Sequence, residues 1–249
     1  MNFAAVIPGL GSQEKGMCLD LARSYKSVAR LIDNVDNAFG LTPSGKLLSQ
    51  IMFEGNPFEQ MIPENGLPML VVNTMATITA LEEESGRKLN EIVSCISGHS
   101  FGEYAALHAV GSMDVKDTIP HLRECGRRML EVLPMGVSAM AAIGKKIKKT
   151  DDNAGGNADA GPEVTPGLIE EIIDRASRPG GNDANREICV IANHNTPHQY
   201  IISGHAPAIN RAVAYAKEKG LAATLLNGLP WAAHSPFMEN RPRMSFGKP

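Results

Sequence analysis

The feature that most constrains the fold of this chain is a strand, a tight turn and a helix encoded by residues 92–110. The apolar run at 92–96 predicts a buried strand, and an alanine-rich helix is predicted to begin at 103–110. Between them, Gly-His-Ser-Phe-Gly at 98–102 matches the G-x-S-x-G pattern of a nucleophile elbow. Glycines two residues either side of Ser100 let strand and helix approach closely, so the turn would present the serine hydroxyl outward.

The bare pattern is weak, because average glycine and serine usage produces it by chance in roughly one chain in ten of this length. The preceding strand, the following helix and a downstream histidine favour Ser100 as a nucleophile. The amide of Phe101 would then supply half of an oxyanion hole, since helix N-termini favour negative charge. The other interpretation is an ordinary strand-to-helix turn.

Composition argues against several classes of function. A net charge of −3 over 249 residues argues against bulk nucleic-acid binding, which usually brings a strongly basic surface. No run approaches about 18 apolar residues and the start lacks signal-peptide features, so no membrane segment is expected. Cys18, Cys95, Cys125 and Cys189 lack C-x-x-C spacing, which predicts reduced thiols, a cytoplasmic location and no metal site.

A glycine-rich stretch at 8–13, Pro-Gly-Leu-Gly-Ser-Gln, follows a predicted strand at 2–7. It fails the dinucleotide pattern G-x-G-x-x-G, because Glu14 stands where the third glycine belongs. A plain loop and a loop that donates a backbone amide to the active site both stay open. Prolines at either end of 63–68 predict a break. Apolar spacing predicts helices at 17–25, 28–39, 47–53, 69–84 and 114–133.

Two groups of basic residues also leave alternatives open. Arg123, Arg127 and Arg128 on the predicted helix 114–133 form either a solvated face or, because this helix follows the elbow helix, a group that reaches the active cleft. The run Lys-Lys-Ile-Lys-Lys at 145–149 is either a solvated loop or a docking patch for an anionic partner.

The pattern changes after residue 136 and predicts a second, smaller unit. Charged and small residues at 145–167 predict a mobile loop. The order β-α-β-β-α-β is typical of a ferredoxin-like split βαβ unit. We therefore expect an α/β fold: an α/β-hydrolase-like core with a parallel sheet, residues 1–136 and 227–249, carrying an inserted ferredoxin-like subdomain at 137–226. The predicted segments are strand 138–143, helix 168–177, strands 188–192 and 199–203, helix 206–219 and strand 222–226.

His234 is the candidate general base for Ser100. It is one of seven histidines and lies in Trp-Ala-Ala-His-Ser-Pro-Phe-Met at 231–238. A serine nucleophile needs an adjacent base, and histidine has the suitable pKa. From spacing alone, however, a single histidine is more often structural.

Five motifs resemble, in order, those of the malonyl-CoA:acyl carrier protein transacylases. The resemblance covers about residues 1–238, and the ferredoxin-like insertion fits it independently. The matching segments are 8–13 with Gly16 and Met17, 98–104, 139–144, 193–197 with 202–204, and 233–238.

The resemblance implies an acyl shuttle in which two half-reactions share one site. Ser100 would attack the thioester of malonyl-CoA while His234 takes its proton, and the acyl group would pass to the phosphopantetheine thiol of acyl carrier protein. It implies no cofactor beyond the CoA thioester substrate and the partner's phosphopantetheine, and we expect a monomer. The further site residues implied are the oxyanion amides of Leu10 and Phe101 and the cleft-lining Asn193 and Asn195.

The sequence departs from the family at named positions. Leu10 and Leu67 stand where the family has glutamine, although Leu10 would still offer its backbone amide. Cys125 occupies the position of the arginine expected to bind the malonate carboxylate, and Arg128, one helical turn on, is the weaker substitute. The family's C-terminal part, which helps to orient the histidine, has no match. We therefore expect weak discrimination between malonyl and acetyl donors.

Two other functions stay open. A serine hydrolase or thioesterase shares the elbow and differs in admitting water; an acidic residue acting as third member between Ser100 and His234 would favour it, and no motif marks one. A diverged or truncated relative that binds CoA or carrier protein with little turnover is supported by Cys125 and by the unmatched C-terminal part. Fluorophosphonate labelling and intact mass after malonyl-CoA would separate these functions.

Overall fold

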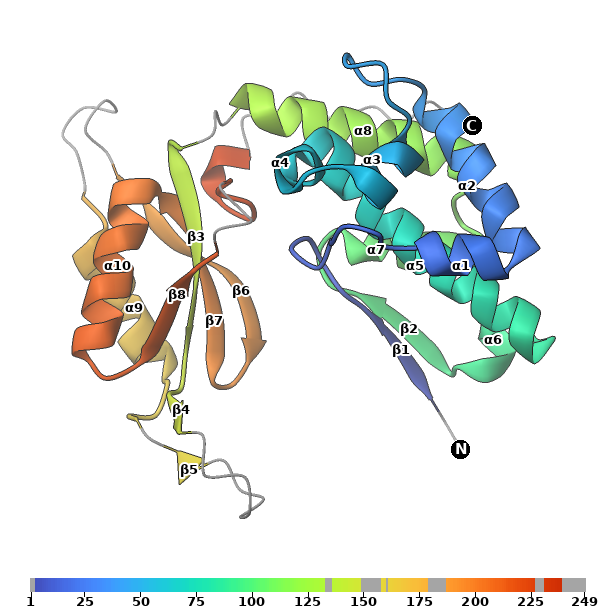
Figure 1. Ribbon diagram of the computed structural model, residues 1–249. Helices are drawn as coiled ribbons and strands as arrows, with labels where there is room; N and C mark the ends of the chain where they lie inside the picture. Colours follow the sequence, from blue (N-terminus) through green and yellow to red (C-terminus); the bar gives the residue numbers. More distant parts are fainter. Residues whose placement is uncertain are drawn as a thin grey trace. The chain divides into compact units, whose positions relative to one another are not determined.

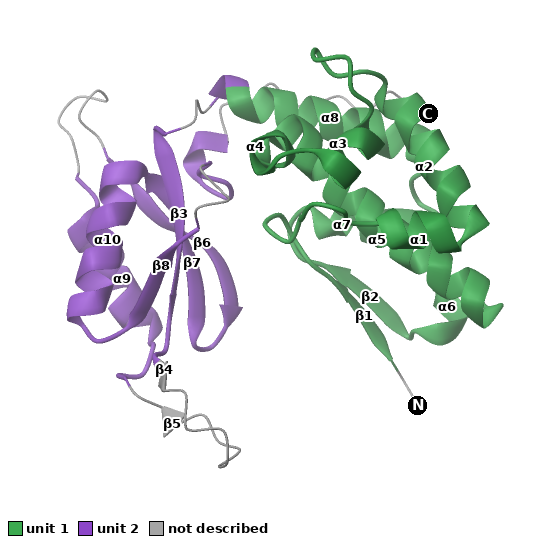
Figure 2. Ribbon diagram, viewed as in Figure 1, with its two compact units in different colours: residues 1–130 green, residues 131–249 purple. Residues whose placement is uncertain are grey.

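The computed structural model of the protein is drawn in Figure 1. It divides into two compact units, Met1–Leu130 and Glu131–Pro249, each with its own hydrophobic core (Figure 2). The predicted boundary at 136/137 lies six residues from this division, and residues 227–249 fall in the second unit; their assignment to the first domain stays a prediction. The described residues are 3–132, 136–148, 158–159, 161–178, 187–226 and 231–238.

The first unit is mostly helical. The helical spacing in 28–39 places Val28, Leu31, Ile32 and Val35 on one face. Val28, Ile32 and Val35 are buried against other helices of the unit and Leu31 is partly buried there, which confirms that spacing. None of the helices within the described ranges combines the length and apolar character needed to cross a membrane. The helices are α1 (Leu19–Ser24), α2 (Lys26–Phe39), α3 (Leu48–Glu54), α4 (Pro57–Met61), α5 (Pro63–Ser85), α6 (Leu89–Ile92), α7 (Gly102–Ala109) and α8 (Val115–Val132).

The break predicted at 63–68 is wrong, because α5 runs without interruption from Pro63 to Ser85. Pro63 occupies the first helical position, where a backbone N–H would have no helical partner. Pro68 lies one turn further on and removes only one hydrogen bond, a loss that the burial of this part of α5 offsets. The predicted end at Gly86 is confirmed, since this residue adopts the left-handed φ of 64° that closes a helix.

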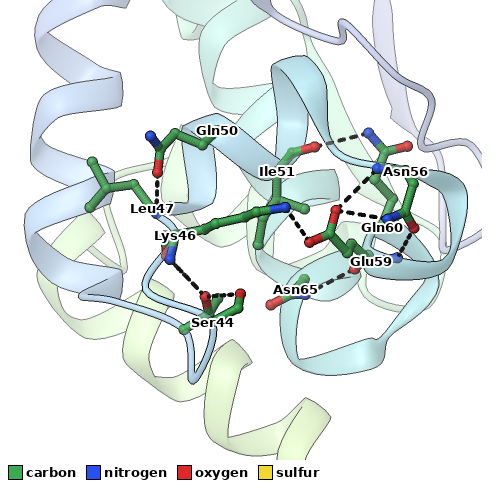
Figure 3. A network of polar contacts seen from close by, with 10 residues as sticks. Ser44, Lys46, Leu47, Gln50, Ile51, Asn56, Glu59, Gln60 and Asn65 are labelled. Atoms are coloured by element: carbon green, nitrogen blue, oxygen red, sulfur yellow. Dashed lines mark hydrogen bonds and ion pairs between the residues drawn. The ribbon is translucent and has the colours of Figure 1, made fainter.

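A polar network fixes the entry into α5 (Figure 3). The Asn56 side chain accepts from the N–H of Glu59 at 3.0 Å, and the Glu59 carboxylate accepts from the N–H of Asn56 at 3.1 Å, which makes a capping box for α4. Buried Gln60 donates to the carbonyl of Ile51 at 3.0 Å. Asn65 donates to the carbonyl of Glu59 at 2.9 Å. The network satisfies buried polar groups where α3, α4 and α5 meet.

The predicted parallel sheet is present as β1 (Ala4–Ile7) paired with β2 (Cys95–Gly98). The prediction of a buried strand at 92–96 is wrong in position, because Ile92 is the last residue of α6 and β2 begins only at Cys95. The N–H of Leu89, the first residue of α6, donates to the Glu82 carboxylate at 2.9 Å. The prediction is also wrong in burial: Cys95 is exposed and Val6 of the partner strand is 79% exposed.

The second unit holds a four-stranded sheet in the order β6-β7-β3-β8, in which all neighbouring strands are antiparallel. One face of this sheet packs against the helices α9 (Pro166–Ala176) and α10 (Ala206–Glu218), and the sheet and both helices share a single hydrophobic core. Apart from two short strands between the first strand and the first helix, the order of elements along the chain matches the predicted β-α-β-β-α-β order. These elements are β3 (Ser138–Gly144), α9 (Pro166–Ala176), β6 (Cys189–Thr196), β7 (Gln199–His205), α10 (Ala206–Glu218) and β8 (Ala222–Leu225).

Two short strands, β4 (Ile147–Lys148) and β5 (Ala158–Asp159), pair within the predicted loop 145–167. Residues 149–157 and 160 lie outside the described residues. The proposed docking role of the lysine run at 145–149 therefore stays a prediction.

Candidate active site

Ser100 lies between β2 and α7 in a strained backbone conformation. Its φ is 54°, in the left-handed region that residues other than glycine rarely adopt. The N–H of Gly102 donates to the carbonyl of His99 at 2.9 Å, and the N–H of Glu103 donates to the carbonyl of Ser100 at 3.0 Å. Such strain persists only where the surroundings enforce it, and it is concentrated at functional sites. The conformation therefore favours the nucleophile interpretation over an ordinary turn.

The two glycines of the turn are required by close backbone contacts. A Cβ on Gly98 would lie 2.2 Å from the carbonyl carbon of Gly102. A Cβ on Gly102 would lie 2.7 Å from the carbonyl oxygen of Pro8. Because neither contact leaves room for a methyl group, the G-x-S-x-G spacing has a steric cause in this fold.

The glycine-rich loop at 8–13 lies against the Ser100 turn. A Cβ on Gly9 would come within 2.7 Å of the His99 side chain and 3.5 Å of the Ser100 Cβ. The N–H of His99 also donates to the carbonyl of Ile7, at 2.9 Å. These contacts bring the backbone next to Leu10 toward the serine, as the backbone-donor interpretation requires. The oxyanion role of the Leu10 amide stays a prediction.

Phe101 is the N-cap residue of α7 and directly follows Ser100. Its ring stacks on Tyr104, with centroids 5.9 Å apart and an interplanar angle of 17°. The first amides of a helix have no carbonyl partner within that helix, so this end of α7 suits developing negative charge. The geometry is compatible with the predicted oxyanion role of Phe101, which stays a prediction.

Cys125, at the position where the resemblance expects arginine, is buried and contacts a histidine. It is 3% exposed, and its Sγ lies 3.5 Å from Nε2 of His121. The Tyr104 hydroxyl lies 3.1 Å from the same nitrogen. Burial raises the pKa of Tyr104 and lowers the pKa of His121, which favours the uncharged form of both rings. Sequence reasoning missed this cluster; the one available signal was the i, i+4 spacing of His121 and Cys125.

Arg128 is held by a carboxylate of its own helix. Its Nε donates to Glu124 at 2.5 Å, and the Nε of Arg127 donates to the same side chain at 2.7 Å. Hydrogen bonds from Arg127 and Arg128 lower the pKa of Glu124 to about 2. The i, i+3 and i, i+4 spacings predict this fork. To bind a substrate carboxylate, Arg128 would have to leave Glu124, so its role as a substitute clamp stays a prediction.

His234 lies in the second unit, in the segment 231–238. Its side chain is exposed and its φ is 53°, so it shares with Ser100 a conformation that few non-glycine residues of the described chain adopt. The segment is anchored: the N–H of Ala232 donates to Ser138 Oγ at 3.0 Å, and Ser235 Oγ donates to the carbonyl of Ala232 at 2.6 Å. A strained turn held by these hydrogen bonds thus presents the imidazole, while its pairing with Ser100 stays a prediction.

Asn193 and Asn195 lie on β6, an edge strand of the sheet; Asn193 directly follows one register shift, and Asn195 lies within a second, between His194 and Thr196. Such bulges redirect side chains. Asn195 is exposed and its Nδ2 donates to Gln199 at 3.1 Å, while Asn193 is half-buried. Asn195 also lines a cavity of about 450 Å³ beside the stacked rings of His194 and Tyr200. Whether the two asparagines contact substrate stays a prediction.

Comparison with known proteins adds sequence and fold relatives. The acyl transferase domain family matches residues 5–178. The malonyl CoA-acyl carrier protein transacylase of Bacillus subtilis (strain 168) is 32% identical over 219 residues, which are 88% of this chain and 58% of that protein. The structure of the malonyl CoA-acyl carrier protein transacylase from Coxiella burnetii matches with a TM-score of 0.76 at 27% identity, covering 96% of this chain and 65% of that one.

A further structural relative is a malonyl-transacylase solved in complex with its type II PKS acyl-carrier protein. It matches with a TM-score of 0.75 at 27% identity, over 96% of this chain and 66% of that one. The chain thus spans 58% of the length of the Bacillus subtilis relative and about two thirds of the two structural relatives. Because the family match covers residues 5–178, more than half of the sequence, the chain belongs to the acyl transferase domain family.

Proposed function

We propose that this chain transfers an acyl group from a CoA thioester to the phosphopantetheine thiol of an acyl carrier protein, by a ping-pong route through an acyl-Ser100, in fatty acid biosynthesis. The observation that carries the proposal is the turn between β2 and α7. Ser100 has a φ in the left-handed region there, and the glycines two residues before and after it have no room for a Cβ. We interpret this turn as a nucleophile elbow. The names of the relatives supply malonyl-CoA as donor and acyl carrier protein as acceptor.

In the first half-reaction, Ser100 Oγ attacks the thioester carbon while His234 accepts the hydroxyl proton. The amides of Phe101 and Leu10 stabilise the oxyanion of the tetrahedral intermediate. Collapse of the intermediate breaks the carbon–sulfur bond, and His234 returns the proton to the departing CoA thiolate. In the second half-reaction, His234 takes the proton of the phosphopantetheine thiol, and the sulfur attacks the acyl-serine ester. The bond between the acyl carbon and Ser100 Oγ then breaks, and His234 returns the proton to Ser100 Oγ.

We assign the two units to the two parts of this machinery. Met1–Leu130 supplies the α/β-hydrolase-like core, and the sheet of the second unit is ferredoxin-like, which its strand order and antiparallel pairing support. We propose that Asn193 and Asn195, on the edge strand β6, contact the bound substrate. The phosphopantetheine belongs to the carrier protein, and we propose a cytoplasmic monomer that needs no cofactor of its own.

Intact mass spectrometry after incubation with malonyl-CoA and with acetyl-CoA tests the proposal. We expect a mass increase of one acyl group that peptide mapping places on Ser100, and its disappearance when holo acyl carrier protein is added. Ser100→Ala should form no adduct while still binding CoA, because the only nucleophile of the turn is gone. An adduct on a cysteine would contradict the assignment, and acyl release at the same rate without carrier protein would identify a thioesterase.

A further inference from the structure

The sheet of the second unit is also buried on the face opposite its helices. Alternate residues of β3 and β7 belong to the core shared with α9 and α10. Because successive side chains of a strand point to opposite faces, Ser138 of β3 and Ser203 of β7 lie on the other face, and both are buried there. The segment 231–238, red in Figure 1, contacts this face, since the N–H of its Ala232 donates to Ser138 Oγ at 3.0 Å.

Two residues on this face form a cross-strand pair. Ser138, the first residue of β3, lies directly opposite His205, the last residue of β7, in the antiparallel register. Residues in this relation have their Cβ atoms about 5 Å apart on the same face of a sheet. The His205 ring is held in turn, because its Nδ1 accepts the N–H of Ile188 at 2.9 Å. Both members of the pair are therefore fixed by the sheet.

The pair contacts the chain on both sides of His234. Ser138 Oγ accepts the N–H of Ala232, two residues before His234. The His205 ring meets the ring of Phe237, three residues after His234, edge to face with centroids 4.6 Å apart. His234 has a φ of 53°, a left-handed conformation that persists only where neighbouring contacts enforce it. These two contacts restrain the backbone before and after the strained residue.

We propose that Ser138 and His205 are positioning residues, which hold the strained backbone of His234 in the orientation that its imidazole needs as a general base. A displacement of about 1 Å at a catalytic group can cost about 10²-fold in rate, so side chains that never touch the substrate can determine the rate. The proposal rests on the proposed role of His234 as the base for Ser100. Neither Ser138 nor His205 takes part in the chemistry.

A double-mutant cycle with His234 tests the proposal on the full chain. Acylation of Ser100 by acetyl-CoA and by malonyl-CoA is followed by quenched intact mass. Ser138→Ala should slow acylation by at least about tenfold, because the buried N–H of Ala232 loses its acceptor and the turn shifts. In the His234→Ala background the same substitution should change the rate by less than about twofold, since no imidazole is left to displace. An equal factor in both backgrounds would show a merely structural role and overturn the proposal.

Ser203→Ala is the matched control. Ser203 lies on the same face of β7 as His205 and is fully buried, and its Oγ has no hydrogen-bond partner among the residues that the structure describes. This substitution removes a buried hydroxyl without removing a hydrogen bond to the His234 turn, so acylation should stay within about twofold of the unaltered chain. A loss as large as that of Ser138→Ala would assign the effect to the sheet in general and overturn positioning by the pair.

Two variants of Phe237 keep the proposal testable if Ser138→Ala does not fold. Phe237 lies in η2 (Pro236–Met238) and is only partly buried, so its replacement should be tolerated. Phe237→Ala removes the ring that meets His205 and should slow acylation by about tenfold. Phe237→Tyr keeps the ring contact and should acylate within about twofold of the unaltered chain. Equal rates for the two variants would overturn the role of His205.

His234→Ala separates failure of this proposal from failure of the proposed function. If His234→Ala acylates Ser100 as fast as the unaltered chain, or if Ser100 takes no acyl group at all, the proposed function loses its base or its nucleophile, and the positioning role falls with it. If His234→Ala slows acylation while Ser138→Ala and Phe237→Ala do not, only the positioning role is overturned.

Discussion

The Nε of Arg123 donates to Oε1 of Glu64 across 2.9 Å, joining α8 to the first turn of α5. The same guanidinium donates to the carbonyls of Phe39 at 2.5 Å and Leu41 at 3.0 Å, and it lies 4.4 Å from the centroid of the Phe39 ring. Arg123 is therefore not simply part of a solvated face. It connects three segments of the first unit.

Arg123→Met should lower the free energy of unfolding by about 2 kcal/mol, because it leaves a partly buried carboxylate and two carbonyls without their charged donor. Urea denaturation followed by circular dichroism measures the change. Arg127→Met is the matched control, since this more exposed arginine pairs with Glu124 of its own helix, and its loss should cost less than about 0.5 kcal/mol. Equal losses in the two variants would contradict the connecting role of Arg123.

Gly98→Ala should prevent correct folding of the first unit or cost at least about 3 kcal/mol, because the added methyl meets the backbone of Gly102 at 2.2 Å. The matched control is Gly167→Ala on α9, where an added Cβ meets nothing within 4 Å. That change should be neutral or stabilise by up to about 1 kcal/mol through helix propensity. Thermal melts compare the two; a Gly98 variant as stable as the Gly167 variant would contradict the steric account of the turn.

His234→Ala should slow acylation of Ser100 by at least about 10²-fold, since the serine loses its general base. Stopped-flow or quenched mass measurements of adduct formation give the rate. His198→Ala, which removes another exposed imidazole of the second unit, should leave the rate unchanged. If the His234 variant matches the unaltered protein, another group must activate Ser100.

Thiol alkylation should follow burial. Burial raises the pKa of Cys18 and of Cys189 to about 12, so at pH 8 only about one thiol in 10⁴ is ionised at either position. Cys95 is exposed. Iodoacetamide at pH 8 should therefore modify Cys95 first and reach the other two only after denaturation, as peptide mass mapping would show.

The raised pKa values of Cys18 and Cys189 also link stability to pH. Ionisation of these thiols favours the unfolded chain, where their pKa has the ordinary value near 9. The free energy of unfolding should therefore fall as pH rises from about 9 toward 12.

Prompt modification of Cys189 in the folded protein would indicate that the core of the second unit opens readily. The same experiment also covers Cys125, on α8. That thiol is also buried, so early labelling there would contradict its packed position beside His121.

Local patterns determined much of this protein. The glycine spacing around Ser100 specified a tight strand-to-helix turn, because only residues without a Cβ permit the backbone approach found there. Alternating and helical periodicities specified the order of elements in the second unit, since both are properties of short segments. The fork of Arg127 and Arg128 on Glu124 also follows from spacing on one helix.

Tertiary structure decided what distant segments do to one another. The partner of Arg123 lies 59 residues away in the sequence, and no local pattern connects the two positions. Continuity of α5 through Pro68 depends on burial that offsets a missing hydrogen bond, and the surroundings of Cys125 depend on Tyr104 arriving from α7. Local spacing fixes which backbone conformations a segment can adopt, whereas ion pairs, burial and pKa values depend on atoms that only folding brings together.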